Sequence, residues 1–139
     1  VFVGGWHSDR GNPYMSEIVA RARRLGVKVT GYVDDQGFEL WLSAVDVVLH
    51  PARVASESGV ISMALGAGKP VVVADHPAFQ GKPAVMFRSV DELASILEAL
   101  SDPKAREESS RRAREYAEQH SWAKVAEMHH QLYTKLLGG

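Results

Sequence analysis

The stretch ESGVISMALGAGKPVVVAD, residues 57–75, brings a polar turn, a helix of small residues and an apolar strand together in direct succession. Gly68 and Pro70 predict where the helix ends, because glycine adopts the left-handed backbone that closes a helix and proline cannot continue one. The segment 70–75 is continuously apolar, which is typical of a strand that is buried on both faces of a sheet. The stretch therefore indicates an α/β fold.

The alternation of strands and helices extends along the chain in both directions. Apolar runs predict strands at 1–5, 28–33, 45–50, 70–75 and, more weakly, 84–87. Apolar residues at spacings of three and four predict helices at 13–25, 37–44, 60–67 and 91–101, the last of them capped by Asp91. Because short connections of this kind join parallel strands by right-handed crossovers, we expect a Rossmann-like, doubly wound parallel sheet of about five or six strands with helices on both faces.

From Asp102 onward the sequence contains only helical signals. Asp102 and Pro103 suit the N-cap and the first turn of one helix, and Ser121 is a natural N-cap for another. An apolar stripe runs along this final helix from Trp122 to Leu136, at spacings of three and four residues. Two C-terminal helices therefore complete the expected fold.

Composition excludes several classes of protein. The 139 residues are the size of one domain, and a formal net charge of −1 without a dense basic run argues against a nucleic-acid partner. The absence of cysteine excludes disulfides and thiolate metal sites, and we expect a cytoplasmic protein or one at the cytoplasmic face of a membrane. No apolar stretch approaches the roughly 18 residues that span a bilayer, so no transmembrane segment is expected. Because the chain begins within a predicted strand, we expect it to be a piece of a longer protein.

Parallel α/β sheets bind ligands outside the carboxyl ends of their strands, and the loop 50–58 is the most informative of those loops. It leaves an apolar strand and enters a helix through Ser58 and Gly59, where free amides and the helix dipole favour a phosphate or a carboxylate. Arg53 would add a positive charge. The alternative is that Ser56 or Ser58 is only an N-cap and that Arg53 is a solvated side chain.

The first two strands lead into weaker candidate loops. Gly4 and Gly5 let a ligand or a neighbouring backbone approach closely, although a simple loop explains them equally well. The backbone at 31–33 could read the edge of a nucleotide base, while Asp34 or Asp35 caps the following helix.

Two further features have simple alternatives. His76 lies beside the predicted carboxyl edge of the sheet, and is either functional or an ordinary loop histidine. The stretch Arg106–Arg114 interleaves glutamate and arginine, which is most simply a solvated helix face.

Several short motifs follow one another along the chain in a characteristic order. They are Val-Gly-Gly at 3–5, Val-x-Val-x-Gly-Tyr-Val-Asp-Asp at 27–35, Leu-Ser-Ala-Val-Asp-Val-Val-Leu-His-Pro at 42–51, Glu-Ser-Gly at 57–59, Ala-Leu-Gly-Ala-Gly-Lys-Pro-Val-Val at 64–72, Ser-Asp-Pro at 101–103, Ser-Trp at 121–122 and Tyr-x-x-Leu-Leu at 133–137. In this order they resemble the donor-binding half of the group 1, retaining glycosyltransferases, which have two facing Rossmann-like domains, the GT-B architecture. The resemblance implies that residues 1–139 are one donor-binding domain, without the N-terminal acceptor domain and the first strand–helix unit.

The resemblance also implies an activity, which is the transfer of a hexose from a nucleoside diphosphate sugar to a saccharide or a lipid-linked acceptor. The donor would be a UDP-, GDP- or ADP-sugar, bound without a metal or a cofactor. The base would lie at the backbone of Tyr32 and Val33. The diphosphate would meet the amides around Ser58, Gly59 and Val60.

Glu57 is the candidate catalytic residue, because it is the carboxylate nearest to the position where the family contacts the transferred sugar. The family pattern has two glutamates eight positions apart, and this sequence has Ala55 and Met63 at those positions. A thioether accepts hydrogen bonds from ribose hydroxyls far more weakly than a carboxylate does. A degenerate, non-catalytic binding or scaffold domain is therefore the first alternative, and a sugar-nucleotide epimerase of the same fold is the second.

The expected partners are the nucleotide-sugar donor and the acceptor domain of the same chain. Since the active cleft needs both halves, we expect no transfer by residues 1–139 alone. The resemblance leaves peripheral membrane contact of the parent protein open. Because the final helix of such enzymes often crosses back to the other domain, its apolar stripe is expected to be partly exposed in this chain or buried by self-association.

Overall fold

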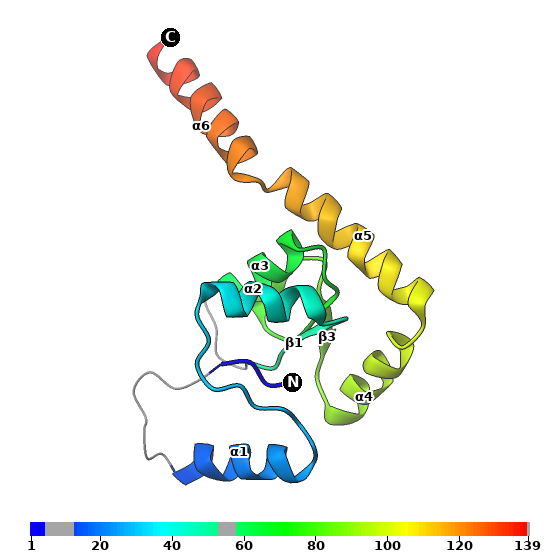
Figure 1. The fold of residues 1–139 in the computed structure, drawn as a ribbon. Helices are drawn as coiled ribbons and strands as arrows, with labels where there is room; N and C mark the ends of the chain where they lie inside the picture. The colour runs from blue at the N-terminus through cyan, green and yellow to red at the C-terminus, as the bar shows by residue number, and fades with distance from the viewer. Residues whose placement is uncertain (5–12, 53–57, 139) are drawn as a thin grey trace. The chain divides into compact units, whose positions relative to one another are not determined.

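The structure, a computed structural model, describes residues 1–4, 13–52 and 58–138. Three of the predicted site residues, Gly5, Arg53 and Glu57, lie outside these ranges. The chain divides into two compact units, Val1–Ala44 and Val45–Gly139, and each is described by itself. Figure 1 labels the elements of both units.

The larger unit contains a three-stranded parallel sheet with the strand order β1-β2-β3. β1 is Val48–His50, β2 is Val71–Ala74 and β3 is Val85–Phe87. The central strand pairs with both neighbours, and each of its four residues is at most 6% exposed. The predicted strand that is buried on both faces is therefore confirmed.

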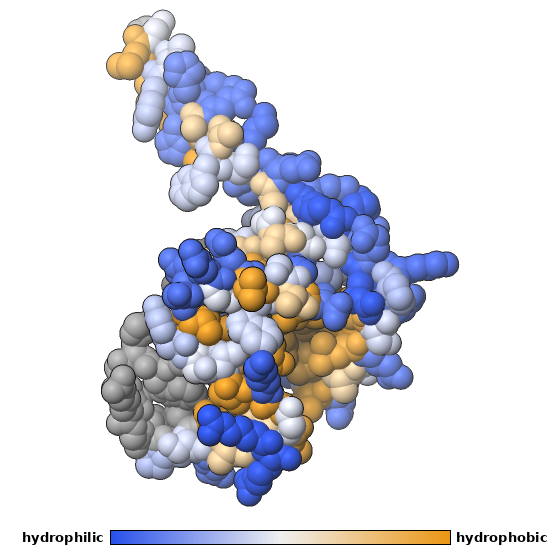
Figure 2. Space-filling model, viewed as in Figure 1, coloured by the Kyte–Doolittle hydropathy of each residue, from blue (hydrophilic) through white to orange (hydrophobic). Residues whose placement is uncertain are grey.

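Helices connect these strands and follow them. α3 (Gly59–Gly66) joins β1 to β2 and contacts both, whereas α4 (Val90–Ala99) follows β3 and contacts it. A short 3-10 helix, η1 (Pro77–Phe79), lies between β2 and β3. α5 (Pro103–Gln119) contacts α3, and α6 (Trp122–Leu137) is the last helix. On the face shown in Figure 2, hydrophilic residues cover most of α5.

Most of the hydrophobic core of the larger unit comes from the stretch 57–75. The largest fully buried side chains are Ile61, Leu65, Val71, Val72, Val73 and Phe79. Only Phe79, in η1, comes from outside that stretch. The segment that indicates the fold in the sequence therefore also supplies most of its core.

α3 ends as the sequence predicts. Gly68 has a φ of 66°, in the left-handed region, and its amide donates to the carbonyl oxygen of Leu65 at 2.9 Å. The amide of Lys69 reaches back to the carbonyl oxygen of Ala64, also at 2.9 Å. These two bonds form a Schellman motif, which satisfies carbonyl groups that the end of a helix would otherwise leave unpaired.

The predicted helix caps are confirmed at two positions and wrong at one. Asp102 caps α5 by accepting from the amide of Lys104 at 3.0 Å, and Ser121 caps α6. The prediction that Asp91 caps α4 is wrong, because the side chain of Ser89 accepts from the amide of Glu92 at 3.1 Å. Ser89 has an extended backbone just before the helix begins, while Asp91 already lies within the first turn.

The smaller unit contains α1 (Pro13–Arg24) and α2 (Asp35–Ala44). α2 begins two residues before the predicted start at 37, because the Asp34 carboxylate accepts from the amide of Gly37 at 2.8 Å. The sequence assigned the cap of this helix to Asp34 or Asp35, and the structure shows that it is Asp34.

The predicted strands at 1–5 and 28–33 form only isolated bridges in the described residues, Phe2 with Val29 and Gly4 with Gly31. Gly4 has a φ of 134° and Gly31 a φ of 73°, so neither glycine has the extended conformation of a regular strand. The expected count of five or six strands is therefore wrong for the described residues, which form a sheet of three. The α/β class, with a parallel sheet and two C-terminal helices, is confirmed.

Candidate functional site

The carboxyl edge of the sheet is where the larger unit gathers its candidate functional residues. β1 ends at His50, β2 is followed by Asp75 and His76, and β3 is followed by Arg88. Since α3 leads from the carboxyl end of β1 to the start of β2, the N-terminus of α3 also lies at this edge. This edge is the usual ligand-binding position of a parallel sheet.

Ser58 shapes the N-terminus of α3. Its side chain is almost completely buried and accepts from the amide of Ile61 at 3.4 Å, and its backbone carbonyl accepts from Ser62 at 3.2 Å. Ser58 is therefore the N-cap of the helix, as one of the two interpretations of the sequence states. The cap uses one of the four amides that a helix start leaves unpaired, so it does not exclude a ligand at the others.

The first turn of α3 leaves space for an anion. In the described part of the chain, nothing accepts a hydrogen bond from the amides of Gly59 and Val60. A Cβ atom built on Gly59 would meet no atom of the described residues within 4 Å, and the side chain of Val60 is 39% exposed. Accessible amides at the positive end of a helix dipole can hold a phosphate group.

Met63 lies one turn further along α3 and is 47% exposed. The side chain at the position where the family pattern has a glutamate is therefore accessible, although it offers only a weak acceptor.

The predicted contacts at Gly4, Tyr32 and Val33 belong to the smaller unit. The amide of Gly4 donates to the hydroxyl of Thr30 at 3.3 Å, so this glycine has a structural role at the bridge between the two segments. Tyr32 is 70% exposed and precedes Val33 and the capping residue of α2. The convergence of these residues with the start of α3 stays a prediction, as do the roles of Gly5, Arg53 and Glu57.

Two histidines and an ion pair also lie at the carboxyl edge. Of the two histidines, only His76 was a separate candidate in the sequence. The rings of His50 and His76 lie 5.8 and 5.7 Å from the ring of the buried Phe79, measured between centroids. Arg88 donates from Nε to Asp75 at 2.8 Å, which links the ends of β2 and β3. The pKa of Arg88 is raised by this hydrogen bond and by the negative charge of Asp75 and Glu92.

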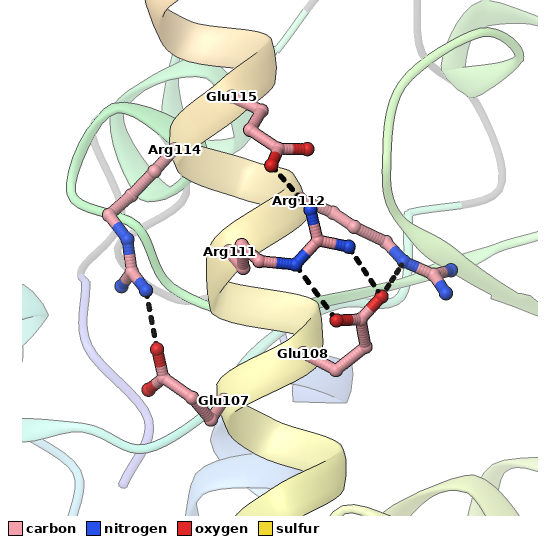
Figure 3. A network of polar contacts seen from close by, with 6 residues as sticks. All are labelled: Glu107, Glu108, Arg111, Arg112, Arg114 and Glu115. Atoms are coloured by element: carbon pink, nitrogen blue, oxygen red, sulfur yellow. Dashed lines mark hydrogen bonds and ion pairs between the residues drawn. The ribbon is translucent and has the colours of Figure 1, made fainter.

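Charged residues on α5 form a separate network, which Figure 3 shows. Arg111 donates to Glu108 at 2.8 Å and also to Glu115, and Arg112 donates to Glu108 at 2.9 Å. Hydrogen bonds from the two arginines lower the pKa of Glu108 to about 2. The side chains of these four residues are 44% to 63% exposed, as expected for a solvated helix face. The described residues contain no group of three or more His, Cys, Asp or Glu side chains that could hold a metal ion.

Comparison with known proteins gives two kinds of match. Residues 1–102 match the model of the family described as "Glycosyl transferases group 1". The search of curated proteins finds no match.

No helix in the described ranges has the length and apolar character needed to cross a membrane.

Solved structures resemble almost the whole chain. Alr3699/HepE from Anabaena, in complex with UDP-glucose, is 24% identical, with a TM-score of 0.74 over 99% of this chain and 40% of its own. Sucrose-phosphate synthase (tll1590) from Thermosynechococcus elongatus is 20% identical, with a TM-score of 0.75 over 98% of this chain and 38% of its own. The chain thus has the fold of one part of these two proteins and spans about two fifths of their length. Because the family model covers well over half of the residues, the chain belongs to the group 1 glycosyltransferases.

Proposed function

We propose that the chain is the donor-binding half of a glycosyltransferase, which moves a hexose from a nucleoside diphosphate sugar to a saccharide or a lipid-linked acceptor. The observation that carries the proposal is the start of α3. Its cap, Ser58, is buried. In the described part of the chain, the amides of Gly59 and Val60 have no acceptor and no atom occupies the space above Gly59. These features meet at the edge of a parallel sheet where ligands bind.

The proposed chemistry follows from the charge of the leaving group. When the glycosidic bond of the donor breaks, the departing nucleoside diphosphate gains negative charge. Amides that are already oriented toward the distal phosphate stabilise this charge without reorganising. The helix dipole also stabilises negative charge at this position. The proposed reaction therefore needs neither a metal ion nor a cofactor.

The rest of the donor would extend from this phosphate site in both directions. We place the base at the backbone of Tyr32 and Val33, beside Gly4 and Gly5, on the resemblance to the family. Arg53 would add positive charge to the diphosphate. Glu57 would hold a hydroxyl group of the transferred sugar, because a carboxylate accepts hydrogen bonds from hydroxyl groups.

The proposal assigns only one half of the reaction to this chain. It spans 40% of the Anabaena structure and 38% of the Thermosynechococcus structure. We therefore expect residues 1–139 to bind the donor weakly and to transfer no sugar on their own, with the acceptor bound by the rest of the parent protein.

A matched pair of glycine substitutions on α3 tests the phosphate site. Gly59 and Gly66 lie at opposite ends of the helix, both are exposed, and a Cβ built on either would meet no atom within 4 Å. Both should therefore accept a larger side chain without a clash. Gly59→Leu would fill the place of the phosphate, whereas Gly66→Leu would not.

The measurement is titration of the labelled chain with UDP, GDP and ADP, followed by the amide resonances of residues 58–63. We expect one of the nucleotides to shift these resonances, and Gly59→Leu to weaken its binding by at least about tenfold, since a hydrogen bond to a charged group contributes about 1.5–3 kcal/mol. Gly66→Leu should bind like the wild type. If no nucleotide shifts these resonances at millimolar concentration, the proposal fails.

The second candidate function is a binding or scaffold domain that has the fold without donor chemistry. Met63 favours it, because an exposed thioether occupies the position of the second glutamate of the family pattern. A folded wild-type chain that binds none of the three nucleotides would support this function. Nucleotide binding that depends on Gly59 would exclude it.

A further inference from the structure

His76 occupies a position at the carboxyl edge of the sheet that the proposed donor site does not yet use. It follows β2, the central strand, and one residue, Asp75, separates it from the end of that strand. The neighbouring strand β1 leads to the start of α3 at the same edge. Because adjacent strands lie about 4.8 Å apart, the imidazole and the first amides of α3 are on neighbouring connections of one sheet.

The imidazole ring of His76 has a fixed orientation. Its Nδ1 atom accepts from the amide of Ala78 at 3.2 Å, which makes His76 the N-cap of η1. One side of the ring contacts the ring of Phe79, with 5.7 Å between centroids. Phe79 is fully buried and also contacts His50, so the ring that supports His76 is itself held in place.

This orientation determines where the proton of the neutral ring lies. A ring nitrogen that accepts a hydrogen bond carries a lone pair, so the neutral imidazole of His76 has its hydrogen on Nε2. In the described ranges of the chain, nothing accepts a hydrogen bond from Nε2. His76 therefore presents an oriented donor at the edge of the sheet.

The role of His76 as a cap does not explain the choice of histidine. Asparagine and serine are preferred caps and would accept the same bond from Ala78. What histidine adds is a ring that packs on Phe79 and a second nitrogen, which lies across that ring from the first. The property that remains without a structural explanation is the donor at Nε2.

We propose that Nε2 of His76 donates a hydrogen bond to a hydroxyl group of the transferred sugar and so positions the sugar of the donor. This inference rests on the proposed function, in which the amides of α3 hold the diphosphate. The sugar is attached directly to the distal phosphate, so its hydroxyl groups reach the neighbouring connection of the sheet. The ring N–H suits a hydroxyl oxygen as its acceptor, while the charged phosphate lies at the helix dipole.

The test compares a nucleoside diphosphate with the corresponding nucleotide sugar. The pairs are UDP with UDP-glucose, GDP with GDP-mannose and ADP with ADP-glucose, and the pair that the wild-type chain binds is used. His76→Asn keeps a side-chain acceptor for the amide of Ala78 and removes Nε2. His130→Asn, at an exposed position of α6, is the matched control.

We expect His76→Asn to lower the affinity for the nucleotide sugar about three- to tenfold and to leave the affinity for the nucleoside diphosphate unchanged, as the loss of one hydrogen bond to the sugar requires. His130→Asn should change neither affinity. An equal loss for both ligands, or no loss for either, overturns the inference and leaves the proposed function standing. A wild-type chain that binds neither ligand overturns both.

A measurement on the wild type applies even if His76→Asn does not fold. Long-range proton–nitrogen spectra of the imidazole report which nitrogen carries the hydrogen. We expect the hydrogen on Nε2, and we expect the Nε2 resonance to move on addition of the nucleotide sugar but not of the nucleoside diphosphate. A hydrogen on Nδ1, or the same shift with both ligands, contradicts the inference.

Discussion

Gly68 is the residue on which the end of α3 depends. Its φ of 66° lies in the left-handed region, and a Cβ atom added there would be 2.8 Å from Cγ of Arg114 on α5. We expect Gly68→Ala to lower the free energy of unfolding by about 1–2 kcal/mol from the backbone conformation alone. The contact with Arg114 adds to this loss. Urea unfolding of the variant and the wild type measures the difference.

Two further variants separate the cost of the backbone conformation at Gly68 from the cost of the contact with Arg114. Gly66→Ala adds a methyl group two residues earlier, where a Cβ meets nothing within 4 Å, and alanine favours a helix over glycine by about 0.5–1 kcal/mol. It should therefore be neutral or stabilising. Combining Gly68→Ala with Arg114→Ala should remove only the steric part of the loss. If the double substitution shows no remaining loss from Gly68→Ala, the conformational argument is wrong.

The sequence predicts single residues well where one local rule decides, and less well where several positions compete. Gly68, Asp102 and Ser121 have the expected roles because each is the best residue for its role at its end of a helix. At α4, serine and aspartate stand two positions apart and both are good caps. The structure selects Ser89, because the backbone leaves the extended conformation immediately after it.

At the scale of an element, α5 carries a charge network whose contribution depends on pH. Hydrogen bonds from Arg111 and Arg112 lower the pKa of Glu108 from its ordinary value of 4.5 to about 2 in the folded chain. Because folding favours the ionised form, the network stabilises the helix fully above about pH 4.5. This stabilisation is lost as the pH falls through about 2.

We therefore expect Glu108→Gln to lower the urea midpoint at pH 7 and to lower it progressively less between pH 4.5 and pH 2, where the wild-type carboxylate itself becomes protonated. The difference should be modest, because the side chains are exposed and water screens their charges. The control repeats the substitution in a chain with Arg111→Gln and Arg112→Gln, where the pH dependence should disappear. A difference that is the same at every pH would contradict the ion pairing.

Strands were harder to predict than helices for a physical reason. A helix satisfies its own backbone, so its apolar spacing and its caps are read from contiguous residues. A strand needs a partner, and in the described residues the apolar runs 1–5 and 28–33 pair through isolated bridges, Phe2 with Val29 and Gly4 with Gly31. The run 70–75 forms the strand β2 because it has a partner strand on either side and its apolar side chains are buried.

At the scale of the whole molecule, the core and the candidate site were predictable to different degrees. The stretch 57–75 supplies both the buried strand and the capped helix start, and both follow from its sequence. The contacts around Phe79 do not, because His50 at the end of β1 and His76 after β2 both pack on its ring. Such contacts follow from the packing of the fold, which no local pattern in the sequence encodes.

α6 is the part of the molecule that is least covered in the described residues. It has 16 residues and no buried side chain, and its large exposed apolar residues are Trp122, Met128, Leu132, Tyr133, Leu136 and Leu137. Isolated helices near this length are marginal in water, and most helices in proteins are stabilised by the packing of one apolar face. We therefore expect the exposed part of the stripe that the sequence predicted to pack against another molecule or another part of the parent protein.

In a sample of residues 1–139 alone, the surface available to α6 is a second copy of the chain. We expect the average mass measured by sedimentation to rise from micromolar to millimolar concentration, because association removes the apolar stripe from water. Replacing Met128 and Leu132, which are 65% and 51% exposed, by glutamate should keep the chain monomeric. Leu40→Glu is the control, since Leu40 on α2 is 74% exposed and lies outside the stripe. A wild-type chain that stays monomeric over this range, with α6 still helical, would show that the stripe needs no partner in solution.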